Sequence, residues 1–132
     1  MFDPNNPCLF CNREPEKIIA ETEHAFLTSD DFPVSKGHML IIPKRHFATQ
    51  FDATEEENND FHHLLLHAKQ HLDEAYQPDG YNIGSNNSEA AGQSVHHLHI
   101  HIIPRYKGDV ESPKGGVRWV IAKNASYSLA GL

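Results

Sequence analysis

Hydrophobic and polar residues alternate most regularly between residues 95 and 103. Leu98, Ile100 and Ile102 occupy every second position, and histidines fill the positions between them. Side chains of a β-strand alternate between its two faces, with about 6.7 Å between neighbours on one face. The pattern therefore predicts a strand over 95–103 that has an apolar face toward the core and a second face carrying histidines.

Other apolar clusters predict further strands. Two short clusters separated by charged residues predict a hairpin over 18–29. A loop with Pro and Gly then leads into a strand at 38–42, which Pro43 ends because it cannot continue a sheet ladder. Two more strands are predicted near 81–85 and over Val117–Ile121.

One segment has helical periodicity. Thr54 and Glu57 form a capping-box pattern, and apolar residues recur at helical spacing up to Tyr76. These residues are Phe61, Leu64, Leu65, Ala68, Leu72 and Ala75. We expect this helix to pack on the sheet. Strands joined by short turns, with one long helix between them, predict an antiparallel α+β fold. We expect it to be a single domain over 1–132, short enough for a partner subunit to complete its site.

Charge and cysteine usage narrow the function. The formal net charge of −7 argues against binding the backbone of nucleic acids, which requires a basic stripe. Binding of a small anionic ligand is still compatible with this charge, and Lys44, Arg45 and Arg105 could assist it.

No apolar run exceeds four residues and the first residues do not resemble a signal peptide, so we expect a cytoplasmic protein without a membrane anchor. Cys8 and Cys11 form a Cys-x-x-Cys pair, which favours a metal or redox role in a reducing compartment.

The alternating histidines suggest nucleophilic chemistry. Neutral imidazole is a good nucleophile near pH 7 because its reference pKa is about 6.5. His99 is the middle member of the row, and a carbonyl holding its Nδ1 hydrogen would leave Nε2 free to attack. Alternatives are a solvated face for the row and, for His38, a satisfied core histidine at a strand start. His63, His67 and His71, four residues apart on the helix, are predicted to be solvent exposed.

The sequence resembles the histidine triad (HIT) nucleotide-binding family. Its signature is three histidines, each separated by one hydrophobic residue and followed by two more, as in residues 97–103. Residues 37–46, residues 92–94 and Asn86 are also typical of the family. The resemblance implies a HIT-like α+β fold, a roughly five-stranded antiparallel sheet with one long and one short helix. It also implies a homodimer.

The resemblance also implies roles for individual residues. The middle histidine of the family forms a covalent nucleotidyl intermediate, so that role falls on His99. Partners that orient groups and handle protons would be His97, His101 and His38. Substrate-binding roles fall on Gln93 and Ser94 for phosphate oxygens, Asn86 for the phosphate or leaving-group side, and Asp30 for the ribose hydroxyls, with a plain turn acid as the alternative for Asp30.

The nucleobase pocket departs from the family pattern. Polar residues surround Asp30, where apolar ones are expected: Thr28, Ser29 and Asp31. Remaining candidates for an apolar base slot, each equally able to be core, are Leu9, Phe10, Ile18 and Phe32.

Cys8 and Cys11 supply half of a tetrahedral zinc site at the usual spacing. Some bacterial HIT proteins and the related galactose phosphate uridylyltransferases bind zinc between similar residues, which by position would add His46 and His97. A zinc closed by four protein ligands would be structural. The alternative is a pair of semi-buried thiols.

Three functions are compatible with these features. The first is a nucleotide hydrolase or transferase that cleaves a nucleoside monophosphate from a dinucleoside polyphosphate or a nucleoside phosphoramidate. The sequence after the triad, residues 102–105, looks more like the diadenosine polyphosphate hydrolase branch. The second is a purine-nucleotide-binding interaction module with little turnover. The third, which would explain the eleven histidines, is a zinc-storage protein.

The segment from Gly115 onward, with Trp119, is expected to shape the leaving-group side of a site, in its own chain or its partner's.

Overall fold

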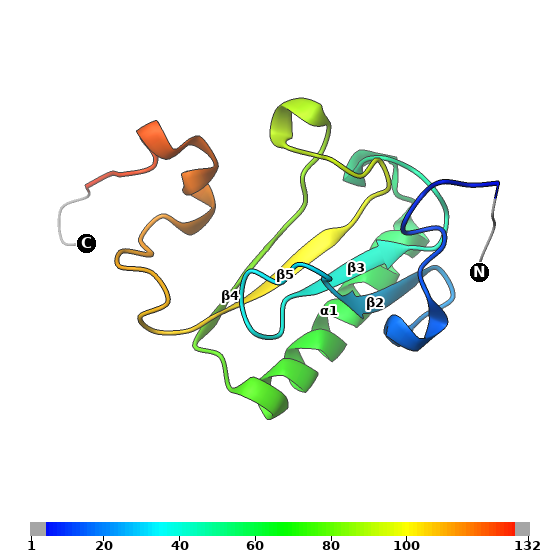
Figure 1. The fold of residues 1–132 in the computed structure, drawn as a ribbon, viewed down its shortest axis with the longest axis horizontal. Helices are drawn as coiled ribbons and strands as arrows, with labels where there is room; N and C mark the ends of the chain where they lie inside the picture. The colour runs from blue at the N-terminus through cyan, green and yellow to red at the C-terminus, as the bar shows by residue number, and fades with distance from the viewer. Residues whose placement is uncertain (1–4, 129–132) are drawn as a thin grey trace.

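The computed structural model describes residues 5–128 and contains a five-stranded antiparallel sheet with one long helix (Figure 1). The strands lie in the order β1-β2-β3-β5-β4. Their bounds are β1 Ile18–Glu21, β2 Ala25–Ser29, β3 Met39–Pro43, β4 Gly80–Gly84 and β5 Ile100–Arg105. The helix α1 spans Glu55–Tyr76, and short 3₁₀ segments lie at Pro15–Lys17, Gln50–Asp52, Glu89–Ala91 and Gly116–Asn124. The α+β architecture agrees with the prediction. No helix in the described part of the chain is long and apolar enough to cross a membrane.

Helix α1 begins and packs as its sequence predicts. The Glu57 amide donates to Thr54 Oγ1 at 3.1 Å, and the Thr54 amide donates to a Glu57 carboxylate oxygen at 2.8 Å, so the capping box is complete. The apolar stripe of the helix is buried against one face of the sheet, and the main core lies between them. His63, His67 and His71 are solvent exposed, as predicted.

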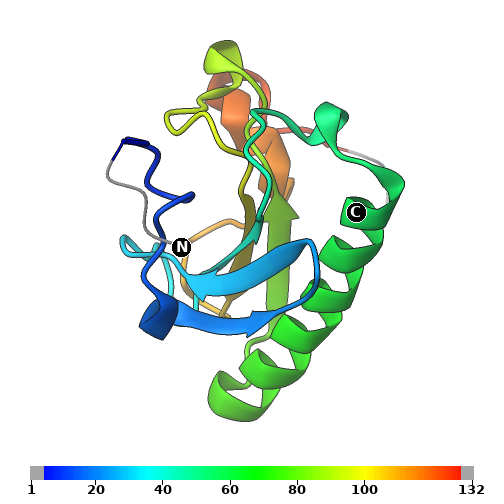
Figure 2. The ribbon, with the colours of Figure 1, turned by 90° about the vertical axis from the view of Figure 1, so that its right-hand side faces the viewer.

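The opposite face of the sheet carries a smaller apolar cluster and most of the chemistry. Phe26, Leu40 and Ile42 alternate with the core residues of β2 and β3 and contact Phe10 and Ile18. In Figure 2 the N-terminal segment lies on this side and α1 on the other. The sheet therefore separates a helix face from a face that the N-terminal segment covers.

The predicted strand over 95–103 is partly wrong, because β5 begins only at Ile100. Pro43, the last residue of β3, directs its carbonyl toward the His97 ring (2.8 Å) and has no N–H with which to extend the ladder on that side. The Leu98 amide instead donates to the Phe47 carbonyl at 2.8 Å. His97 and His99 therefore lie in an irregular segment before the strand, and only His101 lies within it.

The strand predicted over Val117–Ile121 is also wrong. These residues belong to the 3₁₀ segment Gly116–Asn124, whose cap residue Gly115 and first residue Gly116 both have positive φ, 95° and 47°. The Arg118 guanidinium donates to the carbonyls of Asn124 and Ala125, so the segment closes on itself. It lies at the opposite end of the molecule from the N-terminal segment (Figure 1).

Candidate active site

The His99 ring is held in one tautomer. Its Nδ1 lies 2.9 Å from the carbonyl oxygen of His97. Because a carbonyl can only accept, Nδ1 must carry the hydrogen, and Nε2 keeps a free lone pair. The tautomer expected for a nucleophilic His99 is therefore the one in the structure.

A hydrogen-bonded pair of histidines lies beside it. The Val34 amide donates to His38 Nδ1 at 3.1 Å, so in neutral His38 the hydrogen is on Nε2. This Nε2 lies 2.9 Å from His101 Nδ1, which then accepts, and neutral His101 carries its own hydrogen on Nε2. Burial lowers the pKa of both rings, partly opposed at His38 by the negative charge of Asp30. These two hydrogen bonds leave His101 with a donor at Nε2. The ring that orients His101 is His38, which lies 63 residues earlier in the sequence.

Asp30 completes this pair. One of its carboxylate oxygens lies 3.4 Å from His38 Nε2 and 3.8 Å from His101 Nδ1. The other accepts from the Phe32 amide at 2.8 Å, as in an Asx turn. Asp30 is thus both a turn acid and a neighbour of the site histidines. The carboxylate therefore lies next to both rings and is nearest to the Nε2–H of His38.

The four predicted metal ligands converge. Cys8 Sγ lies 3.4 Å and Cys11 Sγ 3.5 Å from His97 Nδ1, and His46 Nδ1 lies 3.3 Å from Cys11 Sγ and 3.1 Å from His97 Nδ1. Around a tetrahedral zinc with bonds of about 2.3 Å to sulfur and about 2.0 Å to nitrogen, two nitrogens are about 3.3 Å apart, a nitrogen and a sulfur about 3.5 Å and two sulfurs about 3.8 Å. The four residues form a possible metal site of the type that zinc prefers.

Two contacts prepare this group for a metal. The fully buried His97 donates from Nε2 to the Pro43 carbonyl at 2.8 Å, which leaves the Nδ1 lone pair facing the cysteines. Burial lowers the pKa of His97 and so favours the neutral ring that a metal requires. The Cys11 amide donates to Cys8 Sγ at 3.4 Å and holds that sulfur at the turn between the two cysteines. Asp30, His38 and His101 could also hold an ion, but the hydrogen bond between their two rings suits acid and base work.

The predicted substrate-binding residues lie in different surroundings. Asn86 lines a hollow of about 490 Å³ together with His38 and His101. Ser94 is exposed and lines a separate hollow with Cys8 and His46. The structure therefore brings Asn86 to the paired histidines and places Ser94 beside the possible metal site.

Gln93 is buried, and its amide binds only main-chain groups in the part of the chain described here. It accepts from the Ser88 amide at 2.8 Å and donates to the carbonyls of Ala48 (2.7 Å) and Val95 (3.2 Å). Its contact with phosphate stays a prediction. In the structure Gln93 holds the loop that leads into the triad.

The base-slot candidates separate into two kinds. The Phe10 ring lies 4.9 Å from the His99 ring, centroid to centroid, and Ile18 packs in the same apolar cluster. Leu9 and Phe32 are exposed, at 67% and 86% of their surface, so neither is core.

The three basic residues expected to assist an anion are engaged elsewhere. Lys44 pairs with Glu21 at 3.0 Å, Arg45 with the buried Glu57 at 2.8 Å, and Arg105 with Asp109 at 2.8 Å. Their charges are therefore largely balanced by neighbouring carboxylates.

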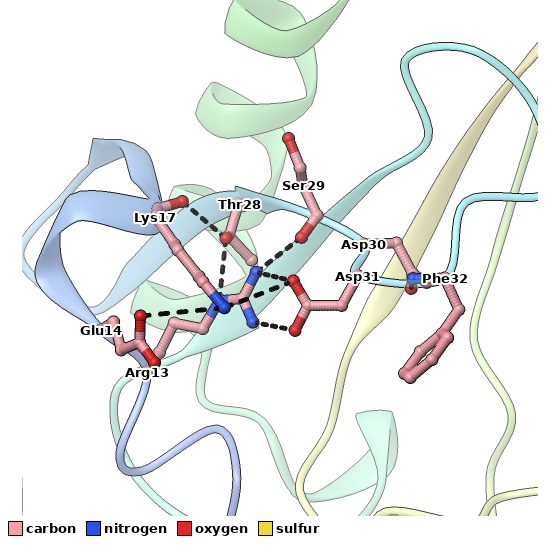
Figure 3. A network of polar contacts seen from close by, with 8 residues as sticks. All are labelled: Arg13, Glu14, Lys17, Thr28, Ser29, Asp30, Asp31 and Phe32. Carbon is pink, nitrogen blue, oxygen red and sulfur yellow. Dashed lines mark hydrogen bonds and ion pairs between the residues drawn. The ribbon is translucent and has the colours of Figure 1, made fainter.

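Sequence reasoning missed Arg13. Its guanidinium donates to Thr28, Ser29 and Asp31, which flank or precede Asp30 (Figure 3). Arg13 also holds the pKa of the Asp31 carboxyl below its usual range. The only available signals were its place two residues after Cys11 and the acidic pair at 30 and 31.

Within its own chain the C-terminal segment reaches the hollow beside the paired histidines through two valines, and the contact of Trp119 with a partner's site stays a prediction. Val117 and Val120 line the hollow that contains His38 and His101. Trp119 instead donates to the Lys114 carbonyl at 3.0 Å and lines a different hollow with Arg105.

Comparison with known proteins gives consistent matches. The HIT domain model matches residues 12–108. An uncharacterized HIT-like protein of Methanocaldococcus jannaschii is 41% identical over 115 residues, which cover 83% of this chain and 87% of that protein. The adenosine 5'-monophosphoramidase of Schizosaccharomyces pombe is 36% identical over 102 residues, or 74% of each chain. A bis(5'-adenosyl)-triphosphatase of Dictyostelium discoideum is 36% identical over 96 residues, or 73% of this chain and 64% of that one.

Solved structures match the same fold. A HIT family protein from Bacillus anthracis has a TM-score of 0.73 at 33% identity and covers 79% of this chain and 77% of its own. A zinc-bound histidine triad family protein from Mycobacterium smegmatis has a TM-score of 0.70 at 32% identity and covers 80% of each chain. The HIT domain match over residues 12–108 includes the whole sheet, the helix and the histidine row.

Proposed function

Because the chain belongs to the HIT family, we propose that it is a nucleotide hydrolase or transferase that acts through His99. Its substrate would be a dinucleoside polyphosphate or a nucleoside phosphoramidate, from which it releases a nucleoside monophosphate. The relatives named as a monophosphoramidase and a bis(5'-adenosyl)-triphosphatase support this substrate class. The observation that carries the proposal is the His99 ring, whose Nδ1 hydrogen is bound by a carbonyl while Nε2 is free.

The reaction would proceed in two displacements. In the first, the Nε2 lone pair of His99 attacks the α-phosphorus, and the bond from phosphorus to the leaving group breaks with its electron pair. In the second, water attacks the same phosphorus, the electron pair of the P–N bond returns to Nε2, and the proton of the water passes to solvent. Each step develops negative charge on the phosphate oxygens, which the Nε2–H of His101 can stabilise as a fixed donor.

We further propose that Cys8, Cys11, His46 and His97 hold one structural zinc. Their spacing and donor set fit the ion, and a similar protein of known structure is zinc-bound. When bound, such an ion supplies folding energy and leaves no coordination position for substrate. We also propose that the protein is a cytoplasmic homodimer. The location is inferred from the sequence, and the dimer from its resemblance to the HIT family.

The test is a substrate panel with the purified protein. The panel contains diadenosine and diguanosine polyphosphates and the phosphoramidates of adenosine and guanosine. Each compound is incubated with the wild type, with His99→Ala and with the exposed control His63→Ala. We expect mononucleotide release by the wild type and by His63→Ala, and a fall of about three orders of magnitude in His99→Ala, because a covalent nucleophile is lost.

Two results would count against the proposal. His99→Ala activity above about a tenth of wild type would remove the nucleophile role. Nucleotide binding by the wild type without any mononucleotide release would favour the alternative, an interaction module that binds purine nucleotides.

A further inference from the structure

The short segment from Cys8 to Arg13 contacts both ends of the histidine site. Its two cysteines belong to the possible metal site, and the two residues between them face opposite ways. Leu9 points to solvent, whereas Phe10 packs inward with a ring centroid 4.9 Å from that of His99 and 6.1 Å from that of His97. Phe10 thus covers the ring that carries the free Nε2.

Arg13 makes the second contact. Its side chain is 9% exposed and donates four hydrogen bonds to residues 28–31. Nε reaches the Thr28 hydroxyl at 3.0 Å, one terminal nitrogen reaches the Ser29 carbonyl at 2.7 Å, and both terminal nitrogens reach the Asp31 carboxylate (Figure 3). The Thr28 hydroxyl in turn donates to the Lys17 carbonyl at 2.7 Å, so the buried hydroxyl both accepts and donates a hydrogen bond.

These bonds fix the residue that Arg13 does not touch. Asp30 lies between Ser29 and Asp31, and Arg13 holds both of those neighbours. The position of the Asp30 carboxylate against His38 and His101 therefore depends on the backbone that Arg13 anchors. A lysine cannot replace this arrangement, because one ammonium cannot form a planar fork and also reach a carbonyl.

We propose that residues 8–13 act as a clamp that positions both ends of the site, with Phe10 ordering His99 and Arg13 ordering Asp30. Both are positioning residues, since they act through His99 and through Asp30 rather than on the reacting atoms. The two cysteines fix the start of the clamp when they bind a metal, and the His97 carbonyl that orients His99 belongs to a residue of the same metal site. The inference concerns the site whose reaction is proposed above and rests on that proposal for the activity measurement.

The experiment combines a spectroscopic and a kinetic measurement on the purified protein as isolated. Phe10→Ala and Arg13→Gln are compared with two controls, His63→Ala on the exposed face of α1 and Lys17→Ala, whose ammonium lies 3.8 Å from Asp31. Imidazole ¹⁵N spectra report the tautomer of each histidine. Elemental analysis and thermal melting confirm that zinc content and fold are retained.

We expect the two variants to affect different histidines. In Phe10→Ala the separate Nδ1 and Nε2 signals of His99 should move toward their mean, while those of His38 and His101 stay unchanged. In Arg13→Gln the His38 and His101 signals should change and those of His99 should not. Turnover should fall about 10- to 100-fold in each variant, as for loss of a residue that orients a catalytic group, and stay within about twofold in the controls. Removal of the metal with a chelator should disturb both sets of signals.

Several results would overturn the clamp. Unchanged histidine spectra in both variants would refute the positioning role. Equal changes in all site histidines in either variant would show general loosening instead of two separate contacts. If the wild type releases no nucleotide, the proposed function fails, while the spectra still decide whether Phe10 and Arg13 position these rings. Should Phe10→Ala fail to fold, Phe10→Leu keeps the apolar volume and tests the loss of the ring alone.

Discussion

Replacing Gln93 by Met tests whether the loop before the triad is held by this side chain. Methionine is similar in length and volume but removes the three hydrogen bonds of the amide, to the Ser88 amide and to the carbonyls of Ala48 and Val95. Gln93 is 5% exposed, so water cannot easily replace the lost partners. We therefore expect a loss of stability with no loss of packing volume.

The magnitude follows from the number of bonds. Each hydrogen bond contributes about 1 kcal/mol net, so the substitution should lower the free energy of unfolding by about 3 kcal/mol. For a chain of this length such a loss corresponds to a fall of about 10 °C in melting temperature. Urea denaturation followed by far-UV circular dichroism measures the free energy directly, and Ser94→Ala, an exposed neighbour, should change it by less than about 0.5 kcal/mol.

If Gln93→Met unfolds within about 0.5 kcal/mol of the wild type, the amide does not hold the loop. Full stability together with a large loss of turnover would instead support the contact with phosphate that the sequence predicts. Gln93→Glu keeps the acceptor for Ser88 but presents oxygen to two carbonyls, so it should destabilise at least as strongly as Met.

The other predictions address the metal, the assembly and the helix. We expect about one zinc per chain by elemental analysis and a lower melting temperature in Cys8→Ser, because a closed site couples metal binding to folding; metal-free protein that melts at the same temperature with and without zinc would contradict this. Light scattering at micromolar concentration should give twice the 14.9 kDa chain mass, and a monomeric mass would exclude the homodimer. In the proposed homodimer Trp119 is expected to reach the partner's site, because in its own chain it lines a hollow apart from His38 and His101. Trp119→Ala should therefore alter selectivity among leaving groups more than nucleotide affinity, and an unchanged substrate profile would separate Trp119 from the site. Thr54→Ala should cost about 1 kcal/mol of stability through loss of the α1 cap, measured by urea denaturation, and no loss would show that the cap is dispensable.

The predictions that held depend on neighbours in the sequence. The extent of α1 was predictable because the Thr54 cap and the apolar spacing are both local features, and the exposure of His63 follows from the same periodicity. The strands near β2 and β3 were predictable because each is a short apolar cluster beside turn residues, and both faces of these strands are buried. The histidine row identified the family and the candidate nucleophile without any knowledge of contacts.

The tertiary structure decided what depends on residues distant in the sequence. Where β5 begins depends on Pro43, whose missing N–H ends the ladder. The segment around Trp119 had a strand-like composition, but glycines with positive φ turn it away from the sheet.

The chemistry of the site depends on distant contacts in the same way. The sequence by itself determined which histidines are present and that His99 is the central one. Which nitrogen of each ring holds the hydrogen depends on a carbonyl, an amide or another ring, supplied by the fold. The role of Arg13 arises only because folding brings the N-terminal segment against the end of β2. A sequence pattern contains the periodicity of one segment, whereas a hydrogen bond between two segments forms only after both have packed. The site residues were therefore predictable from the sequence, but their protonation and positioning were not.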